Sequence, residues 1–150
     1  MNTLIAEPDN AIRKISGNHF RLVRLLPVQL TQLPASTLQL KQLRMMAQVR
    51  DHELFVRESA SGISAFMALQ FTPGHDSSIR FLLIKYFATD RFALHDRAAA
   101  QMEETATRIA AEAGCTALLV RANALNAAAT KFYRERGYAL NGQVLIKSLT

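Results

Sequence analysis

Short runs of apolar residues in the middle of the chain predict a group of strands. Glu53–Glu58 and Ile63–Phe71 are two such runs, and the glycine-containing loop Ser59–Gly62 between them is typical of a hairpin. Ile79–Ala88 follows a turn and is the longest apolar stretch of the chain, as expected of a buried strand. The pattern therefore predicts three consecutive strands, the third of them central in a sheet.

Two other segments carry apolar residues at spacings of three and four, which predicts helices. The first, Ser36–Arg50, places on one helical face Leu40, Leu43, Met46 and Ala47. The second, Asp96–Ala113, carries a core stripe formed by Met102, Ala106, Ile109, Ala110 and Ala113. One helix is therefore expected before the three strands and another after them.

The final third of the chain predicts a strand, a short helix and two more strands. Ala117–Val120 is an apolar run of the length of a buried strand. A helix is predicted for Ala127–Arg136, and Gly137 ends it because glycine adopts a left-handed conformation at little cost. Another strand begins at Tyr138, and the last strand is Val144–Leu149.

The beginning of the chain is less regular. Met1–Asn18 is polar and weakly patterned, so we expect residues 1–18 to be a loosely held N-terminal extension. His19–Leu26 alternates imperfectly and predicts a first strand. The resulting order of strands and helices indicates a single layered α/β (α+β) domain with a mixed sheet over residues 19–150.

Length and composition agree with one globular domain. The chain has 150 residues, of which 49% are hydrophobic and 20% are charged. No apolar stretch is long enough to span a bilayer, and Glu7 and Asp9 lie where a secretory signal would need an apolar core, so no membrane association is expected. The single cysteine, Cys115, cannot form an internal disulfide, which fits a cytoplasmic location.

The last third also carries a motif of a known family. The C-terminal signature of the GNAT superfamily of N-acetyltransferases resembles a run of this chain, Asn126-x-x-Ala129-x-x-Phe132-Tyr133-x-x-x-Gly137-Tyr138. The usual lead-in to that signature resembles Ala110-x-x-x-Gly114-Cys115. The resemblance implies a GNAT-like mixed, mostly antiparallel central sheet flanked by helices. It also implies transfer of an acetyl group from acetyl-CoA to a primary amine of a small molecule or a protein.

The segment expected to bind the pyrophosphate departs from the family pattern. In the family, a loop with the pattern R/Q-x-x-G-x-G/A opens a long helix, and its backbone N–H groups bind the pyrophosphate. Here the motif falls on Leu94–Ala99, where Leu94 replaces the basic or amide residue and Arg97 replaces the first glycine. Either the Arg97 guanidinium binds a phosphate in place of the glycine backbone, or the loop binds coenzyme A weakly or not at all.

The resemblance assigns roles to further residues. The pantetheine arm would be lined by Phe87, Ala88 and Thr89, and the pyrophosphate would face Arg97, Ala98 and Ala99. Asn126 would hold the arm with its amide, and it also suits the N-cap of the following helix. Tyr133 would protonate the leaving thiolate, because its ordinary pKa of about 10 keeps the phenol protonated at neutral pH. The alternative for Tyr133 is a tyrosine of the core.

A general base for the amine is harder to assign. Ile79–Ala88 holds no carboxylate, and the candidates are His52 and His75 at the ends of neighbouring strands, although a surface histidine is the commoner case. No cluster has metal-ligand spacing, and no serine or cysteine lies in a nucleophile motif. Direct attack of the substrate amine on the thioester is therefore the simplest chemistry.

Two other functions stay open at this point. One is a non-catalytic GNAT-like binding or regulatory module, and the other is an acyltransferase that uses a longer acyl-CoA or an acyl carrier thioester. The net charge of +6 favours polyanions such as coenzyme A, whereas the dispersed basic residues make nucleic acid an unexpected partner. The acceptor amine and the formation of a homodimer are left open by the sequence.

Overall fold

The structure is a computed structural model that describes residues 12–15, 28–29, 52–59, 62–73, 80–89, 97–122 and 125–149. The expected strand His19–Leu26 and the expected helix Ser36–Arg50 lie outside the described residues. The same holds for His75 and for residues 94–96 of the expected pyrophosphate loop.

Three long strands follow one another where the hydrophobic pattern predicts them. They are β3 (His52–Ser59), β4 (Gly62–Pro73) and β5 (Arg80–Thr89). β4 lies between the other two and pairs antiparallel with each, so that Met67 is opposite Phe55 on β3 and Phe87 on β5. A strand with neighbours on both edges suits the apolar run from which it was predicted.

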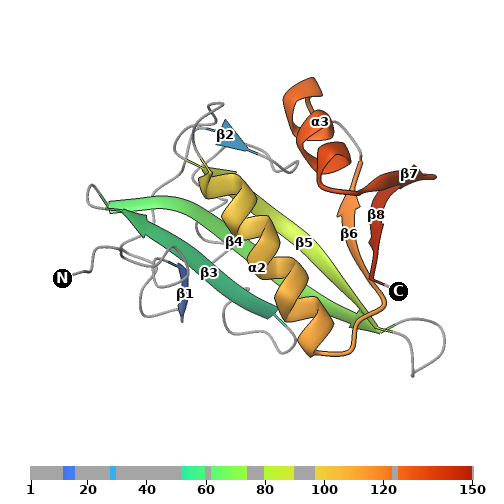
Figure 1. Ribbon diagram of the computed structural model, residues 1–150, viewed down its shortest axis with the longest axis horizontal. Helices are drawn as coiled ribbons and strands as arrows, with labels where there is room; N and C mark the ends of the chain where they lie inside the picture. The colour runs from blue at the N-terminus through green and yellow to red at the C-terminus, as the bar shows by residue number, and fades with distance from the viewer. Residues whose placement is uncertain are drawn as a thin grey trace.

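The remaining strands, with β1 (Ile12–Ile15) at one edge, extend this unit into a sheet with the order β1-β3-β4-β5-β6-β8-β7 (Figure 1). β6 (Ala117–Arg121) runs parallel to β5, and β8 (Val144–Ser148) pairs antiparallel with β6. β7 (Ala139–Asn141) completes a hairpin with β8. The one parallel pair among the described strands confirms the expected mixed, mostly antiparallel sheet.

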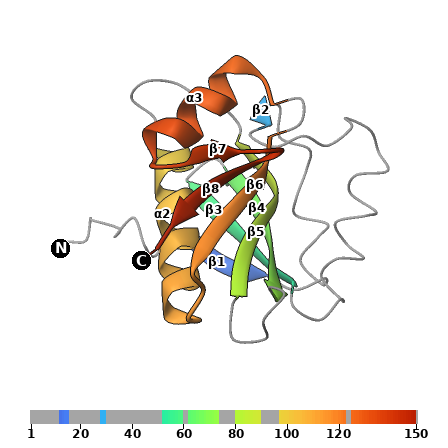
Figure 2. The same cartoon turned by 90° about the vertical axis from the view of Figure 1, so that its right-hand side faces the viewer.

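Both described helices belong to one side of this sheet (Figure 2). α2 (Ala98–Glu112) lies along the sheet, and α3 (Ala127–Glu135) follows β6. Gly137, at a φ of 98°, ends the α3 segment in the left-handed conformation expected from the sequence. The positions of both helices confirm the predicted segments to within a few residues.

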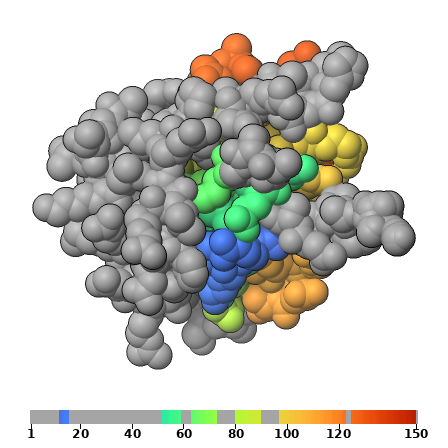
Figure 3. All heavy atoms as spheres, turned by 90° about the vertical axis from the view of Figure 1, so that its left-hand side faces the viewer, coloured from blue at the N-terminus to red at the C-terminus, as the bar shows by residue number. Residues whose placement is uncertain are grey.

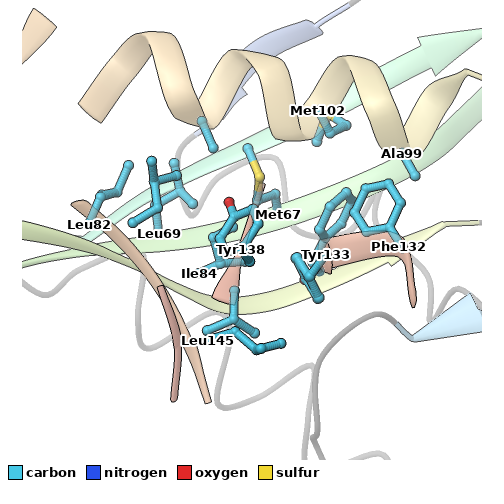
Figure 4. Packing of buried hydrophobic residues seen from close by; sticks show 14 of the residues in the cluster. Met67, Leu69, Leu82, Ile84, Ala99, Met102, Phe132, Tyr133, Tyr138 and Leu145 are labelled. Carbon is cyan, nitrogen blue, oxygen red and sulfur yellow. The ribbon is translucent and has the colours of Figure 1, made fainter. Parts of the chain in front are cut away.

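The main core lies between α2, α3 and the facing side of the sheet. Figure 4 shows Phe132 and Tyr133 of α3 beside Met102 and Ala99 of α2, with Leu82 and Ile84 of β5 in the same layer. A second apolar cluster covers the opposite side of the sheet and consists of Ile15, Leu54, Val56, Phe66, Ala68, Tyr86 and Ala88. Successive residues of β5 therefore contribute to different clusters, as the pleat of a strand requires.

β1 (Ile12–Ile15) corrects one expectation. The sequence placed residues 12–15 in a loosely held extension, whereas the structure places them in the sheet, antiparallel to β3. Ile15 is opposite Leu54 and is buried with it in the second cluster. Figure 3 shows β1 at the surface beside β3, at the edge of the sheet. A strand of four residues has too few alternating positions to stand out from a polar segment, and its pairing is decided by β3.

Candidate functional site

β5 and β6 part from one another halfway along the sheet. Among the described residues, the two strands are paired from Phe81 opposite Ala117 to Leu83 opposite Leu119, and the residues that follow are not paired with each other. We call the point after Leu83 and Leu119 the parting of the two strands. β5 is also irregular at this point, because its pairing with β4 skips Lys85 between Ile84 and Tyr86. A bulge of this kind bends the strand and increases its twist, which turns the end of β5 away from β6. The sequence showed no sign of the bulge.

The outer edge of β5 beyond the parting is paired with β2 (Val28–Gln29). Val28 is opposite Thr89 and Gln29 is opposite Ala88. On one edge of β5, Ala88 and Thr89 are opposite Phe66 and Ala65 of β4. β2 therefore lies on the other edge of β5, the edge that pairs with β6 nearer the start of the strand. This is the edge at which the family resemblance places the pantetheine arm. β2 was not predicted from the sequence.

Phe87, Ala88 and Thr89 are fully buried at the end of β5. Phe87 points into the main core, where its ring meets Phe132 of α3 edge-on at 6.1 Å between centroids. Ala88 belongs to the second cluster, on the opposite side of the sheet. The Thr89 hydroxyl is buried without a hydrogen-bond partner among the described residues. A buried hydroxyl in this state is unfavourable, so Thr89 marks a place suited to a polar ligand atom or a water.

α2 begins beside the end of β5 without a side-chain cap. Its N-cap residue is Arg97, and Ala98 and Ala99 in the first turn are buried. No acidic residue lies in that turn, so the turn itself places no carboxylate at the positive end of the helix dipole. The Arg97 guanidinium is exposed and lies 3.5 Å from the Glu104 carboxylate, along the helix. In this structure Arg97 therefore forms an ion pair on the helix surface.

Asn126 forms the N-cap of α3. Its side-chain oxygen accepts a hydrogen bond of 2.7 Å from the backbone N–H of Ala129, which satisfies one of the unpaired donors of the first helical turn. The capping role expected for Asn126 is therefore confirmed. The cap uses Oδ1, while the amide also carries two N–H donors that a ligand could use.

Tyr133 is buried completely in the main core. Its ring packs edge-on against Phe132 and Tyr138, at 5.2 Å between centroids in each case (Figure 4). Its hydroxyl has no hydrogen-bond partner among the described residues. Burial raises the pKa of Tyr133 well above its ordinary value, and the nearby Glu103 carboxylate raises it further. Tyr133 is thus held as a neutral phenol that keeps its proton.

A buried carboxylate below these tyrosines was missed in the sequence analysis. Glu103 of α2 is fully buried, and its Oε2 accepts hydrogen bonds of 2.9 Å each from Thr107, Tyr138 and Lys147. Its Oε1 accepts a bond of 3.2 Å from Nε of Arg136. Burial, followed by the Glu103 charge, also raises the pKa of Tyr138. The sequence did carry one signal for this site: Glu103 lies within the apolar stripe of α2, where a charged residue is unexpected unless it has buried partners.

One of the two histidines proposed as bases falls within the described residues. His52 Nε2 on β3 lies 3.3 Å from Lys85 Nζ at the bulge of β5. Burial lowers the pKa of Lys85, and the charge of Arg121 lowers it further. His52 lies on the side of the sheet opposite α2, because it is two residues from Leu54 of the second cluster.

The remaining features of the described residues add no second site. A hollow of about 540 Å³ has lining residues from the outward side of α3 only, namely Ala127, Thr130, Lys131, Arg134 and Glu135. A hollow along a single helix would enclose little of a ligand. The described ranges contain no group of histidine, cysteine and acidic residues arranged to hold a metal ion, and no helix of the length and apolar character required to cross a membrane.

Comparisons with known proteins identify the fold. No profile of a known family and no curated protein matches the sequence significantly. Solved structures of GNAT acetyltransferases, however, match most of the chain, so the chain has the GNAT acetyltransferase fold and the resemblance of its motif is confirmed at that level.

Three of these structures illustrate the likeness. A tyrosine-to-phenylalanine mutant of the AtaT toxin, bound to acetyl-CoA and to the C-terminus of the antitoxin AtaR, is 16% identical, with a TM-score of 0.66 and 91% of each chain covered. An aminoglycoside acetyltransferase from an uncultured soil sample is 17% identical, with a TM-score of 0.64 over 91% of this chain and 94% of the other. The ribosomal-protein-alanine N-acetyltransferase of Brucella melitensis is 14% identical, with a TM-score of 0.66 over 87% and 93%.

Proposed function

We propose that this protein is an N-acetyltransferase that moves an acetyl group from acetyl-CoA to a primary amine. The observation that carries the proposal is the buried hydroxyl of Tyr133, which has no partner among the described residues. Because burial raises its pKa, the phenol of Tyr133 carries its proton over the whole physiological pH range. Tyr133 lies on the helix that follows β6, beside Phe132, whose ring meets Phe87 near the end of β5, and this position suits protonation of a leaving sulfur.

Other residues around the parting fit acetyl-CoA. Thr89 offers a second buried hydroxyl without a partner among the described residues, at the end of β5. Asn126 offers its amide N–H groups next to the first turn of α3. The first turn of α2, with no acidic residue and with Arg97 as N-cap, is suited to the pyrophosphate. Acetyl-CoA would supply the activated thioester, and the chain would position it and provide the proton.

β2 adds a condition to this proposal. The pantetheine arm and β2 compete for one edge of β5, at Ala88 and Thr89. We therefore infer that β2 leaves this edge when acetyl-CoA binds. A two-residue strand is suited to such an exchange, because few backbone hydrogen bonds hold it in place.

Binding and turnover test the proposal separately. Acetyl-CoA at millimolar concentration is expected to raise the melting temperature, because a ligand that binds only the native state stabilises it. Release of free coenzyme A thiol in the presence of a panel of primary amines then measures turnover. A melting temperature that does not change with acetyl-CoA, together with no heat of binding in calorimetry, would overturn the proposed function.

A non-catalytic binding module is the second candidate. Two observations favour it: Arg97 is paired with Glu104, and β2 occupies the edge of β5. Such a module would show no thiol release with any amine, whether or not acetyl-CoA changed its melting temperature. Thiol release that depends on both acetyl-CoA and an amine would exclude it.

A further inference from the structure

One row of residues crosses β3, β4 and β5 at the end of the sheet where α2 begins (Figure 1). Arg57 on β3 is opposite Ala65 on β4, and Ala65 is opposite Thr89 at the end of β5. Directly opposed residues of antiparallel strands share one face of the sheet. Ala65 is part of the main core, so this row lies on the side of the sheet that carries α2.

Two neutral side chains hold the Arg57 guanidinium against α2. Its Nε donates a hydrogen bond of 2.7 Å to Oε1 of Gln101, and its Nη1 donates one of 3.0 Å to the hydroxyl of Ser64. Ser64 is buried, and the pairing of β3 with β4 skips it between Ile63 and Ala65. Because a bulge of this kind re-aims side chains, the bulge and Gln101 together give the guanidinium a defined orientation.

The charge of Arg57 has no counter-ion among the described residues. By contrast, ion pairs with glutamates are formed by Arg13, Lys14, Arg97, Arg136 and Lys147. Arg57 is half-buried, and its Nη2 group donates to no side chain in the described ranges. A partly buried cation without an anion is unfavourable, and the planar guanidinium matches the geometry of a phosphate. Arg57 is therefore suited to an anionic ligand.

The first turn of α2 lies beside this guanidinium. Gln101 is four residues after the N-cap residue Arg97, so the two lie on the same side of the helix. The turn holds no acidic residue, and the backbone N–H groups at a helix start favour an anion. Thr89, at the other end of the row, has a buried hydroxyl without a partner among the described residues. A guanidinium, a helix start and an unpaired hydroxyl thus occur at one end of the sheet.

We propose that Arg57 binds a phosphate group of acetyl-CoA together with the first turn of α2. Arg57 supplies the basic contact that the pyrophosphate loop lacks, because Leu94 stands where the family pattern has a basic or amide residue. Gln101 and Ser64 are positioning residues that orient the guanidinium. The motifs that carry the family resemblance lie later in the chain and do not include Arg57. The inference rests on the proposed acetyltransferase function and adds a residue to its cofactor site.

The test compares three ligands that carry different phosphates. They are acetyl-CoA, dephospho-acetyl-CoA, which lacks the 3′-phosphate, and S-acetylpantetheine, which has no phosphate. Arg57→Met is expected to raise the Kd of acetyl-CoA in calorimetry about tenfold at low salt, the size of one charge-assisted contact, and less as the salt concentration rises. The Kd of S-acetylpantetheine should not change. A loss shared by dephospho-acetyl-CoA places Arg57 at the pyrophosphate, and a loss for acetyl-CoA alone places it at the 3′-phosphate.

Further variants separate charge, orientation and fold. Arg57→Lys keeps the charge without the planar fork, and Gln101→Leu keeps the guanidinium without its partner on α2, so both should cause smaller losses with the same dependence on the ligand. Arg134→Met, at an exposed site of α3, changes the net charge equally and should leave all three affinities unchanged. The melting temperature of each variant without ligand shows whether it folds. If Arg57→Met does not fold, Arg57→Lys and Gln101→Leu carry the same comparison.

The outcome distinguishes this inference from the function on which it rests. A wild type that binds none of the three ligands would remove the proposed function. A wild type that binds acetyl-CoA, with unchanged affinity in a folded Arg57→Met, would overturn the role of Arg57 alone. An equal loss for acetyl-CoA and S-acetylpantetheine would overturn it too, because Arg57 would then act through the fold and not on a phosphate.

Discussion

Tyr138 donates its phenolic hydrogen to the Glu103 carboxylate over 2.9 Å, and this bond links the C-terminal motif to the middle of α2. Arg136 and Lys147 bind the same carboxylate from α3's C-terminal end and from β8. Three segments after residue 135 are thus tied to one buried acid. Tyr133, the proposed acid, packs against Tyr138, so this network also fixes the position of the Tyr133 ring.

Replacement of Glu103 tests the role of the network in stability. Glu103→Gln is expected to reduce the free energy of unfolding by about 2–3 kcal/mol, because Lys147 loses its counter-ion and Arg136 keeps only its ion pair with Glu104. Chemical denaturation measures the change. Glu112→Gln, at an exposed site in the last turn of the same helix, is the matched control and should change stability little. Equal stability of the two variants would show that the network contributes nothing measurable.

The two packed tyrosines are expected to respond in opposite ways. Tyr133→Phe removes a hydroxyl without a partner among the described residues, so stability should hold while turnover falls by roughly 10²–10⁴-fold. Tyr138→Phe removes the bond to Glu103 and should lower stability by about 1–3 kcal/mol. Thermal melting and thiol release measure both effects. Turnover preserved in Tyr133→Phe would make Tyr133 a residue of the core alone.

Substitutions of Asn126 separate its cap from its predicted contact with pantetheine. Asn126→Ala should cost about 1 kcal/mol of stability, whereas Asn126→Ser retains a capping oxygen and should cost less. Both variants lose the amide N–H groups, so both should weaken acetyl-CoA binding by about 1–2 kcal/mol in calorimetry. Wild-type affinity in Asn126→Ser would restrict Asn126 to capping.

Substitutions of Arg97 and Glu104 test whether the Arg97 guanidinium contributes to acetyl-CoA binding. Arg97→Ala should weaken acetyl-CoA binding about three- to tenfold at low salt, and less as the salt concentration rises. Glu104→Gln should strengthen binding, because it removes the carboxylate that lies 3.5 Å from the Arg97 guanidinium; it also removes the 2.7 Å ion pair of Glu104 with Arg136, so the melting temperature is measured as well. The comparison ligand is pantetheine without pyrophosphate, which neither substitution should affect. An equal loss for both ligands would assign Arg97 to the fold.

The exchange of β2 for the pantetheine arm can be followed by amide hydrogen exchange. With acetyl-CoA, the backbone of Val28 and Gln29 should exchange faster, while Ala88 and Thr89 stay protected by their new partner. The β7–β8 hairpin, which lies away from this edge, serves as the internal reference. Unchanged protection of β2 at saturating acetyl-CoA would show that the arm follows another path.

Much of the fold and part of the site were predictable because they depend on neighbours in the chain. The apolar runs of β3, β4 and β5 reflect alternation along each strand, and Gly137 marks a backbone conformation at its own position. The cap at Asn126 joins residues three apart. Each of these features depends on residues that are close together in the sequence, so the hydrophobic pattern and the motif were enough to predict these features.

The tertiary structure alone decided which distant residues meet. β1 is a strand because β3 offers an edge 45 residues away, as the contact between Arg13 and Glu58 shows. The bulge at Lys85 depends on how β5 is paired with β4, and the meeting of Lys85 with His52 follows from it. Glu103 is charged within an apolar stripe, and only packing supplies its donors. Such contacts are set by the free energy of pairing and burial across the whole domain, which no local pattern contains.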